Sequence, residues 1–133
     1  MQALYTASAT ATGDGRGGHT RSSDGVLDLD LAVPKEMGGP GGALTNPEQL
    51  FAAGYSACLH SAVKTIAKGS GIDVTDSAIR VEIGLVKGDT GFSLFAQLYA
   101  DVDMKDGSDS IQSYFGLNYD VSKLFGGSKP GTN

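Results

Sequence analysis

The stretch NPEQLFAAGYSACLHSA, residues 46–62, predicts the longest element of the chain and contains its only cysteine, Cys58. Small residues and larger apolar residues are mixed here, and proline occurs only at the first turn, which favours a helix. The motif Gly69-Ser70-Gly71 provides a stop signal, so the helix is predicted to end at about Lys68. The small residues around Cys58 would let this helix approach another element closely.

The start of this helix has two alternative caps. Asn46 is a good N-cap, Pro47 suits the first helical position, and Gln49 completes a capping-box pattern. The alternative cap is Thr45, with Glu48 as its partner. Both alternatives begin the helix at nearly the same residue.

Strand patterns surround the helix. Residues 3–12 and 26–33 alternate before it, and residues 78–86 and 92–102 form a predicted hairpin after it. Glycine-rich segments between these elements, residues 13–25 and 34–45, are predicted as loops. The order of two strands, a long helix and two strands predicts one small α+β domain over residues 1–133.

The C-terminal part of the sequence gives two alternatives. Residues 106–115, DGSDSIQSYF, resemble the start of a helix capped by Asp106 or Ser108. Residues 117–125, LNYDVSKLF, either continue that helix or form a last strand, and residues 126–133 are predicted to be a frayed tail.

Composition and charge exclude several classes of protein. The net charge is -5 with an isoelectric point near 4.7, and no cluster of lysine and arginine is present, which argues against nucleic-acid binding. No segment approaches the ~20 apolar residues of a membrane span, and no signal peptide is recognised. A lone cysteine cannot form an internal disulfide, and together these features predict a cytoplasmic protein. The negative net charge also predicts no contact with an anionic membrane surface.

Cys58 is either a small packing residue or a reactive thiol. An ordinary thiol has a pKa of about 8.5, so a reactive one needs a nearby cation to favour its thiolate. Arg16 and Arg21 in the glycine-rich loop are the candidates, and Glu48 is suited to orient an arginine through its carboxylate. Each of these charged residues has an ordinary alternative, as a solvated loop charge or a helix-start acid.

The two histidines do not complete a metal site. His60 follows Cys58 by two residues, so on a helix it points about 160° away and is poorly placed as a base for the thiol. His19 lies far from both in sequence, and the three residues show no ligand spacing. We therefore predict neither a bound metal nor a cofactor.

Two long segments carry a family resemblance. The stretches LYTASATATGDGRGG, residues 4–18, and SSDGVLDLDLAVPKEMGGPGGALTNPEQLFAAGYSAC, residues 22–58, closely resemble the organic hydroperoxide resistance branch of the OsmC-like proteins. The match runs from residue 4 to about 66 and includes GFSLFAQLYADV, residues 91–102. Its TNPEQLFAAGYSAC block is long and specific.

The resemblance implies a fold, an activity and a site. The family fold is α+β, an intertwined homodimer in which antiparallel sheets wrap around long central helices and active sites lie at the dimer interface. Its members are thiol peroxidases for organic hydroperoxides, usually reduced by lipoyl-type dithiols. Cys58 matches the peroxidatic cysteine, Arg16 the catalytic arginine and Glu48 the glutamate that holds it. An apolar substrate mouth is predicted from Phe51, Leu44, Met37 and Phe92.

The sequence also departs from the family pattern. The family's second, resolving cysteine is missing, and the match fades from about residue 104. The arginine loop is one residue longer than in some members, so the assignment of Arg16 could slip to Arg21. Three accounts stay open: a one-cysteine peroxidase, a fold retained for ligand binding, and a truncated or frame-shifted product.

The resulting hypothesis is a peroxidase that reduces organic hydroperoxides to alcohols through a Cys58 sulfenic acid, in defence against oxidative stress. Its partners would be the hydroperoxide, an external thiol or dithiol reductant, and a second copy of the chain. The alternatives are a non-catalytic OsmC-like protein that binds a small ligand, and a redox sensor that is oxidised without turnover.

Overall fold

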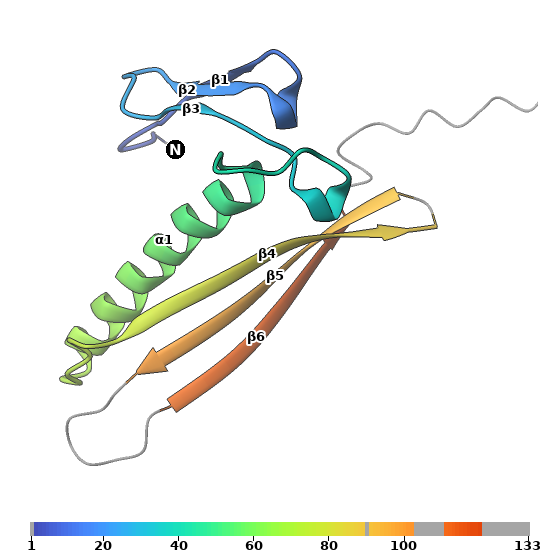
Figure 1. Ribbon diagram of the computed structural model, residues 1–133. Helices are drawn as coiled ribbons and strands as arrows, with labels where there is room; N and C mark the ends of the chain where they lie inside the picture. Colours follow the sequence, from blue (N-terminus) through green and yellow to red (C-terminus); the bar gives the residue numbers. More distant parts are fainter. Residues whose placement is uncertain (1, 90, 103–110, 121–133) are drawn as a thin grey trace, which may run out of the picture. The chain divides into compact units, whose positions relative to one another are not determined.

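A computed structural model describes residues 2–89, 91–102 and 111–120 of the chain. The chain divides into two compact units, the first ending at Leu50 and the second beginning at Phe51. Each unit contains one three-stranded antiparallel sheet (Figure 1). The single-domain organisation stays a prediction.

The sheet of the first unit is built from short strands. β1 (Ala9–Thr12), β2 (His19–Ser22) and β3 (Asp28–Asp30) pair in the order β1-β2-β3. The predicted strands over 3–12 and 26–33 are thus present but shorter, because β2 offers only four residues for pairing on either side.

Strand β2 was not predicted, since it lies inside the glycine-rich segment assigned to a loop. Gly13 and Gly15 adopt positive φ values of 72° and 62°, which allow the chain to turn back after β1. One turn of 3-10 helix, Gly15–Gly17, follows and carries Arg16. The chain then enters β2 directly after Gly18.

The segment after β3 leads to the helix. Leu31 forms a parallel bridge with Thr45, and the N–H of Ala32 donates to the Thr45 carbonyl at 3.0 Å. Leu31 and Ala32 are buried, so the core of the first unit lies at this bridge. The predicted loop over residues 34–45 contains a single 3-10 turn, Lys35–Met37.

Helix α1 (Pro47–Gly69) begins where the sequence predicts and ends one residue later than expected. The Gln49 N–H donates to Asn46 Oδ1 at 2.9 Å, which confirms Asn46 as the N-cap. The alternative cap is wrong, because the Thr45 hydroxyl donates to Gln49 Oε1 at 2.9 Å. The side chain of Gln49 therefore reaches Thr45 rather than closing the reciprocal capping box.

The sheet of the second unit consists of long strands. β4 (Ala78–Gly88), β5 (Gly91–Val102) and β6 (Ile111–Asp120) pair in the order β4-β5-β6, all antiparallel (Figure 1). The predicted hairpin is confirmed, with a tight turn between Gly88 and Gly91.

Strand β6 decides between the two C-terminal alternatives. The predicted helix is wrong at residues 111–115, because this segment pairs along β5 instead of forming local bonds. The strand alternative holds over residues 117–120. Asp106, Ser108 and the tail 126–133 lie outside the described residues.

The second unit has a small core. The buried side chains lie near the end of α1, on the connection to β4 and on one face of the β4–β5 pair: Ala67, Val74, Ser77, Val81 and Ala96. The Ser77 hydroxyl donates to the Val74 carbonyl at 2.7 Å, so its oxygen accepts from His60 Nε2 at 3.0 Å. His60 thus links α1 to the connection and does not act as a base toward Ser77.

Candidate functional site

Arg16 and Glu48 form an ion pair in the first unit. The 3-10 turn before β2 carries Arg16, and the first turn of α1 carries Glu48. Arg16 Nη1 lies 2.7 Å from Glu48 Oε1, with 41% of the arginine side chain and 14% of the glutamate side chain exposed. The glutamate is therefore largely covered, while the arginine side chain stays partly exposed.

The pair keeps unused hydrogen-bonding capacity. Arg16 Nη1 and Glu48 Oε2 are both buried and make no hydrogen bond within the part of the chain that the structure describes. The 2.7 Å contact from Arg16 Nη1 to Glu48 Oε1 is an ion pair and not a hydrogen bond. A buried polar atom without a partner is costly, so this place favours a further polar group.

Arg21, the alternative arginine, has a different partner. Its Nε lies 3.3 Å from Asp28 Oδ2 across the β2–β3 ladder, and its side chain is mostly exposed. Arg16 is thus the arginine that meets Glu48. The lengthened loop does not shift this pairing to Arg21.

Cys58 lies on α1 in the second unit and is exposed. Its helix face is predicted from the three- and four-residue spacing as Phe51, Gly54, Tyr55, Ala62 and Thr65. Of these residues only Tyr55 is partly covered. Cys58 is therefore not packed into the core of the second unit. Arg16 and Glu48 belong to the first unit.

The four predicted substrate residues are divided between the units. Met37 and Leu44 belong to the first unit, Phe51 and Phe92 to the second, and all four are exposed. Phe51 makes a tilted ring contact with Tyr55, with centroids 5.8 Å apart. These exposed apolar side chains are available for contacts beyond their own units.

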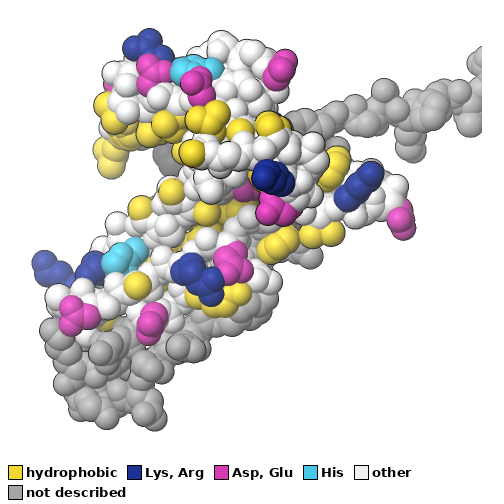
Figure 2. Space-filling model, viewed as in Figure 1, with side chains coloured by type: hydrophobic (Ala, Val, Ile, Leu, Met, Phe, Trp, Pro, Cys, Tyr) yellow, Lys and Arg dark blue, Asp and Glu magenta, His cyan; other side chains and the backbone are white. Residues whose placement is uncertain are grey.

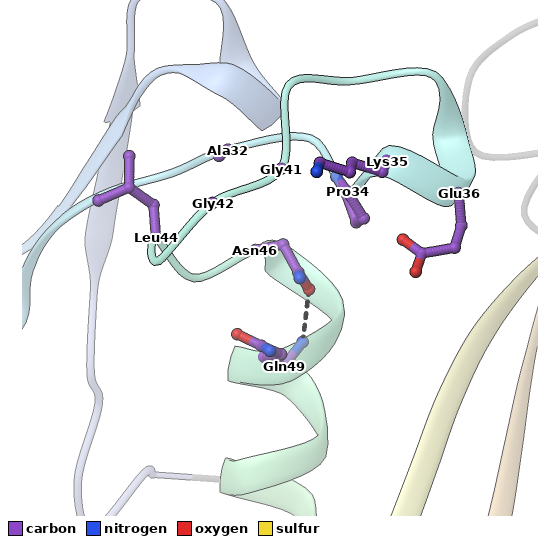
Figure 3. A pocket seen from close by; sticks show the side chains of 9 residues that line it. All are labelled: Ala32, Pro34, Lys35, Glu36, Gly41, Gly42, Leu44, Asn46 and Gln49. Carbon is purple, nitrogen blue, oxygen red and sulfur yellow. Dashed lines mark hydrogen bonds between the residues drawn. The ribbon is translucent and has the colours of Figure 1, made fainter.

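A cavity of about 250 Å³ lies in the first unit at the start of α1 (Figure 3). Lys35 extends along Gly41, and both Lys35 and Glu36 line the cavity from the 3-10 turn (Figure 3). The walls come from Ala32, Pro34, Lys35, Glu36, Gly41, Gly42, Leu44, Asn46 and Gln49. Of the predicted substrate residues, Leu44 lines this cavity.

Sequence analysis missed a charged cluster on the first sheet, visible as a cyan, magenta and dark blue patch over β1–β3 (Figure 2). His19 Nδ1 lies 2.7 Å from Asp30 Oδ1, and His19 Nε2 lies 2.6 Å from Asp28 Oδ1. Hydrogen bonds to Asp30 and then Asp28 raise the pKa of His19 above its usual 6.5. The alternation of Asp28 and Asp30 was the available signal, but it indicated only a solvated strand face.

Metal-binding clusters and membrane-spanning helices are both absent from the described residues. No group of three histidine, cysteine, aspartate or glutamate side chains gathers there to hold a metal ion. Nor is any helix among them long and apolar enough to cross a membrane.

Comparison with known proteins gives consistent relatives. The family model described as OsmC-like protein matches residues 39–114, more than half of the chain. An organic hydroperoxide resistance protein of Xanthomonas axonopodis pv. citri is 47% identical over 96 residues, covering 71% of this chain and 67% of that protein. The organic hydroperoxide resistance protein OhrB of Bacillus subtilis is 47% identical over 108 residues, covering 78% and 74%.

Solved structures agree with this assignment. The crystal structure of an organic hydroperoxide resistance protein from Legionella pneumophila superposes with a TM-score of 0.69 at 48% identity, covering 76% of this chain and 73% of that one. The predicted α+β fold is confirmed, whereas the homodimer stays a prediction. The chain belongs to the OsmC-like protein family.

Proposed function

We propose that this chain is a cysteine-based peroxidase for organic hydroperoxides and contributes to organic hydroperoxide resistance. Relatives at 47% identity are named organic hydroperoxide resistance proteins. The observation that carries the proposal is the Arg16–Glu48 ion pair, which holds a partly exposed arginine side chain in a chain whose single thiol is exposed. We place its action in the cytosol, where a free thiol stays reduced.

Helix geometry supports a homodimeric site. Glu48 and Cys58 are ten residues apart on α1, which is about 15 Å along the helix axis. A guanidinium that touches Glu48 therefore cannot also touch Cys58 of the same chain. We propose that Arg16 of one copy meets Cys58 of another, across the small-residue face of α1 that contains Gly54 and Ala62.

The proposed site has three roles. Arg16 would stabilise the Cys58 thiolate and polarise the peroxide, and it stays charged at any relevant pH. Glu48 would hold the guanidinium in place through its largely covered carboxylate. The unused capacity of Arg16 Nη1 and Glu48 Oε2 fits a site that is completed by a partner or a substrate.

The reaction balances without a metal or cofactor. The Cys58 thiolate attacks the distal oxygen of the hydroperoxide, the O–O bond breaks, and the released alkoxide takes a proton to become an alcohol. Sulfur loses two electrons and becomes a sulfenic acid, while the peroxide gains them. The exposed apolar side chains of Leu44, Met37, Phe51 and Phe92 would favour an alkyl over a hydrogen peroxide.

The sulfenic acid needs an external reductant, because the chain has no second cysteine. One thiol attacks the sulfenic sulfur, releasing water and forming a mixed disulfide. A second thiol then frees Cys58 and leaves an external disulfide. A lipoyl-type dithiol would supply both thiols from one molecule.

The test measures loss of the free Cys58 thiol against added cumene hydroperoxide, with hydrogen peroxide in parallel. We expect one thiol lost per peroxide, a faster reaction with the organic peroxide, and no reaction in Cys58→Ser. Arg16→Ala should slow the reaction about 100-fold, as removal of a charge-stabilising donor does. Arg21→Ala, the matched control, should change it less than about threefold.

Two results would replace this proposal with its alternatives. A thiol that ignores both peroxides would leave a non-catalytic ligand-binding protein. A thiol that is oxidised once, but is not regenerated by dihydrolipoamide or a monothiol, would leave a redox sensor.

A further inference from the structure

The charged cluster on the first sheet is a clamp across two strands. His19 begins β2, and its two ring nitrogens contact Asp30 at 2.7 Å and Asp28 at 2.6 Å on β3. The backbone register places His19 opposite Asp30 and Arg21 opposite Asp28. One side chain thus bridges two carboxylates of the neighbouring strand.

Hydrogen-bond chemistry determines the charge of His19. An ionised carboxylate only accepts, so both ring nitrogens must donate, and only the imidazolium has two donors. The hydrogen bonds to Asp30 and Asp28 also raise the pKa of His19 above 6.5. The charged groups that face it are these two aspartates and Arg21 on its own strand, since β1 carries none.

His19 lies at the base of the turn that carries Arg16. It pairs with Thr12, the last residue of β1, so the Thr12–His19 pair closes the turn over residues 13–18. The preceding Gly18 donates its N–H to Gly15 O at 3.1 Å, and its carbonyl accepts from Leu31 N–H at 2.8 Å. The position of Arg16 therefore depends on how β2 is held to β3.

The other end of β3 leads to Glu48. Leu31 follows β3 directly and bridges to Thr45, next to the Asn46 cap of α1. Glu48 lies in the following turn. Both members of the Arg16–Glu48 pair are thus anchored on β3, one through β2 and the other through the bridge to Thr45.

We propose that His19 is a positioning residue, and that its imidazolium fixes the Arg16 turn relative to Glu48 by clamping β2 to β3. This inference rests on the proposed function for its effect on catalysis. Its structural part, the dependence of Arg16 on the charge of His19, stands apart from any peroxide chemistry. If His19 lost its proton, one of its ring nitrogens would have no hydrogen to donate to the carboxylate that it faces.

The first experiment follows the Arg16 Nε–H and His19 ring signals by NMR through a pH titration of the whole chain. We expect the Arg16 signal to shift with the midpoint of His19, above 6.5. In Asp30→Asn the two midpoints should fall together, since Asp30 is the first cause of the raised pKa. His60→Gln, which changes the histidine bound to Ser77 in the other unit, should leave both midpoints unchanged.

The second experiment compares oxidation of Cys58 by cumene hydroperoxide in a single turnover. At pH 6 His19→Gln should be slower than the unsubstituted chain by about 10-fold, because small misplacement of a catalytic group is costly. The ratio should approach one above the His19 midpoint, where the unsubstituted chain has also lost the charge. His19→Lys, which keeps a cation, should recover most of the rate at pH 6.

The two readouts separate the possible failures. An Arg16 signal that ignores the His19 titration would overturn the clamp, whatever the activity. A His19→Gln ratio that is the same at every pH would also overturn it, because a general folding defect does not follow one proton. If Cys58 does not react with peroxide at all, the proposed function fails and the NMR titration still decides the clamp.

Discussion

The two sheets of this chain have the same number of strands and the same order, yet different forces hold them together. The strands of the first sheet have four, four and three residues, whereas those of the second have eleven, twelve and ten. Charged side chains link β2 to β3 in the first sheet. In the second, buried Val81 and Ala96 lie on one face of the β4–β5 pair.

This contrast separates a sheet that positions a charge from a sheet that supports a core. Short strands contribute few ladder bonds, so the first sheet depends on its turns and ion pairs, which are sensitive to local changes and to pH. Long strands with a buried face depend on apolar area, which does not titrate. Substitutions in each sheet can test this difference.

Gly18→Ala should damage the first sheet most. A Cβ at this position would lie 2.1 Å from the Thr12 carbonyl oxygen, and its three nearest atoms are all backbone, which cannot rotate away as a side chain can. We expect a loss of about 3 kcal/mol in the stability of this unit, measured by amide hydrogen exchange over β1–β3.

Gly69→Ala is the control for this change. Its Cβ would meet nothing within 4 Å, and alanine favours a helix, so stability should stay equal or rise slightly. Equal effects of the two substitutions would contradict the close approach at Gly18.

Val81→Ala should destabilise the second sheet by about 1–2 kcal/mol, because it removes two methyl groups from a buried site. Val86→Ala on the same strand is the control, since that side chain is 51% exposed and its loss should cost about 0.5 kcal/mol or less. Urea unfolding measures both. If Val86 proved as costly as Val81, the buried face would not be the source of stability.

Asn46→Ala tests the start of α1, which belongs to the first unit. Removing the side-chain acceptor for the Gln49 N–H should cost about 1 kcal/mol, read from thermal unfolding. Asn46→Asp keeps an acceptor and should retain most of the stability. A neutral alanine substitution would show that this cap contributes nothing.

Acid should loosen the turn between β2 and β3. Hydrogen bonds from the Ser22 hydroxyl at 2.6 Å and the Val26 N–H at 3.0 Å lower the pKa of Asp24 below 3.8. A lowered folded pKa gives stability that is present above pH 3.8 and lost as pH falls through the folded value.

The measurement for this turn is the protection factor of β2 and β3 amides, corrected for the intrinsic exchange rate, between pH 5 and 3. Protection should fall in both chains, because the carboxylates of Asp28 and Asp30 also link β2 to β3, but it should fall less in Asp24→Asn, which lacks the Asp24 carboxylate. Equal pH dependence in both chains would assign the effect to another carboxylate.

The sequence was sufficient where structure is local. The cap at Asn46 and the stop after Lys68 predicted α1 to within a residue, and alternation around a glycine turn predicted the β4–β5 hairpin. β2 was missed because four residues in a glycine-rich segment show no period, and their strand conformation comes from partners on both sides.

Pairing between distant residues could not be predicted in the same way. Local patterns left the segment 111–115 open to a helix, and only its register with β5 makes it a strand. Residue chemistry predicted Glu48 and one of two arginines, and the family resemblance favoured Arg16. The choice between Arg16 and Arg21 depends on the register that places Arg21 opposite Asp28. The contacts of His19 follow from that same register.

The distance between Glu48 and Cys58 along α1 has a genetic consequence. If each site takes its arginine from one copy and its cysteine from the other, then Arg16→Ala chains, which react about 100-fold more slowly, and Cys58→Ser chains, which do not react, can complement one another. Random mixing of the two should restore about a quarter of the activity, because half of the dimers are mixed and each mixed dimer has one intact site. A chain that carries both substitutions should restore no activity when it is mixed with either single variant.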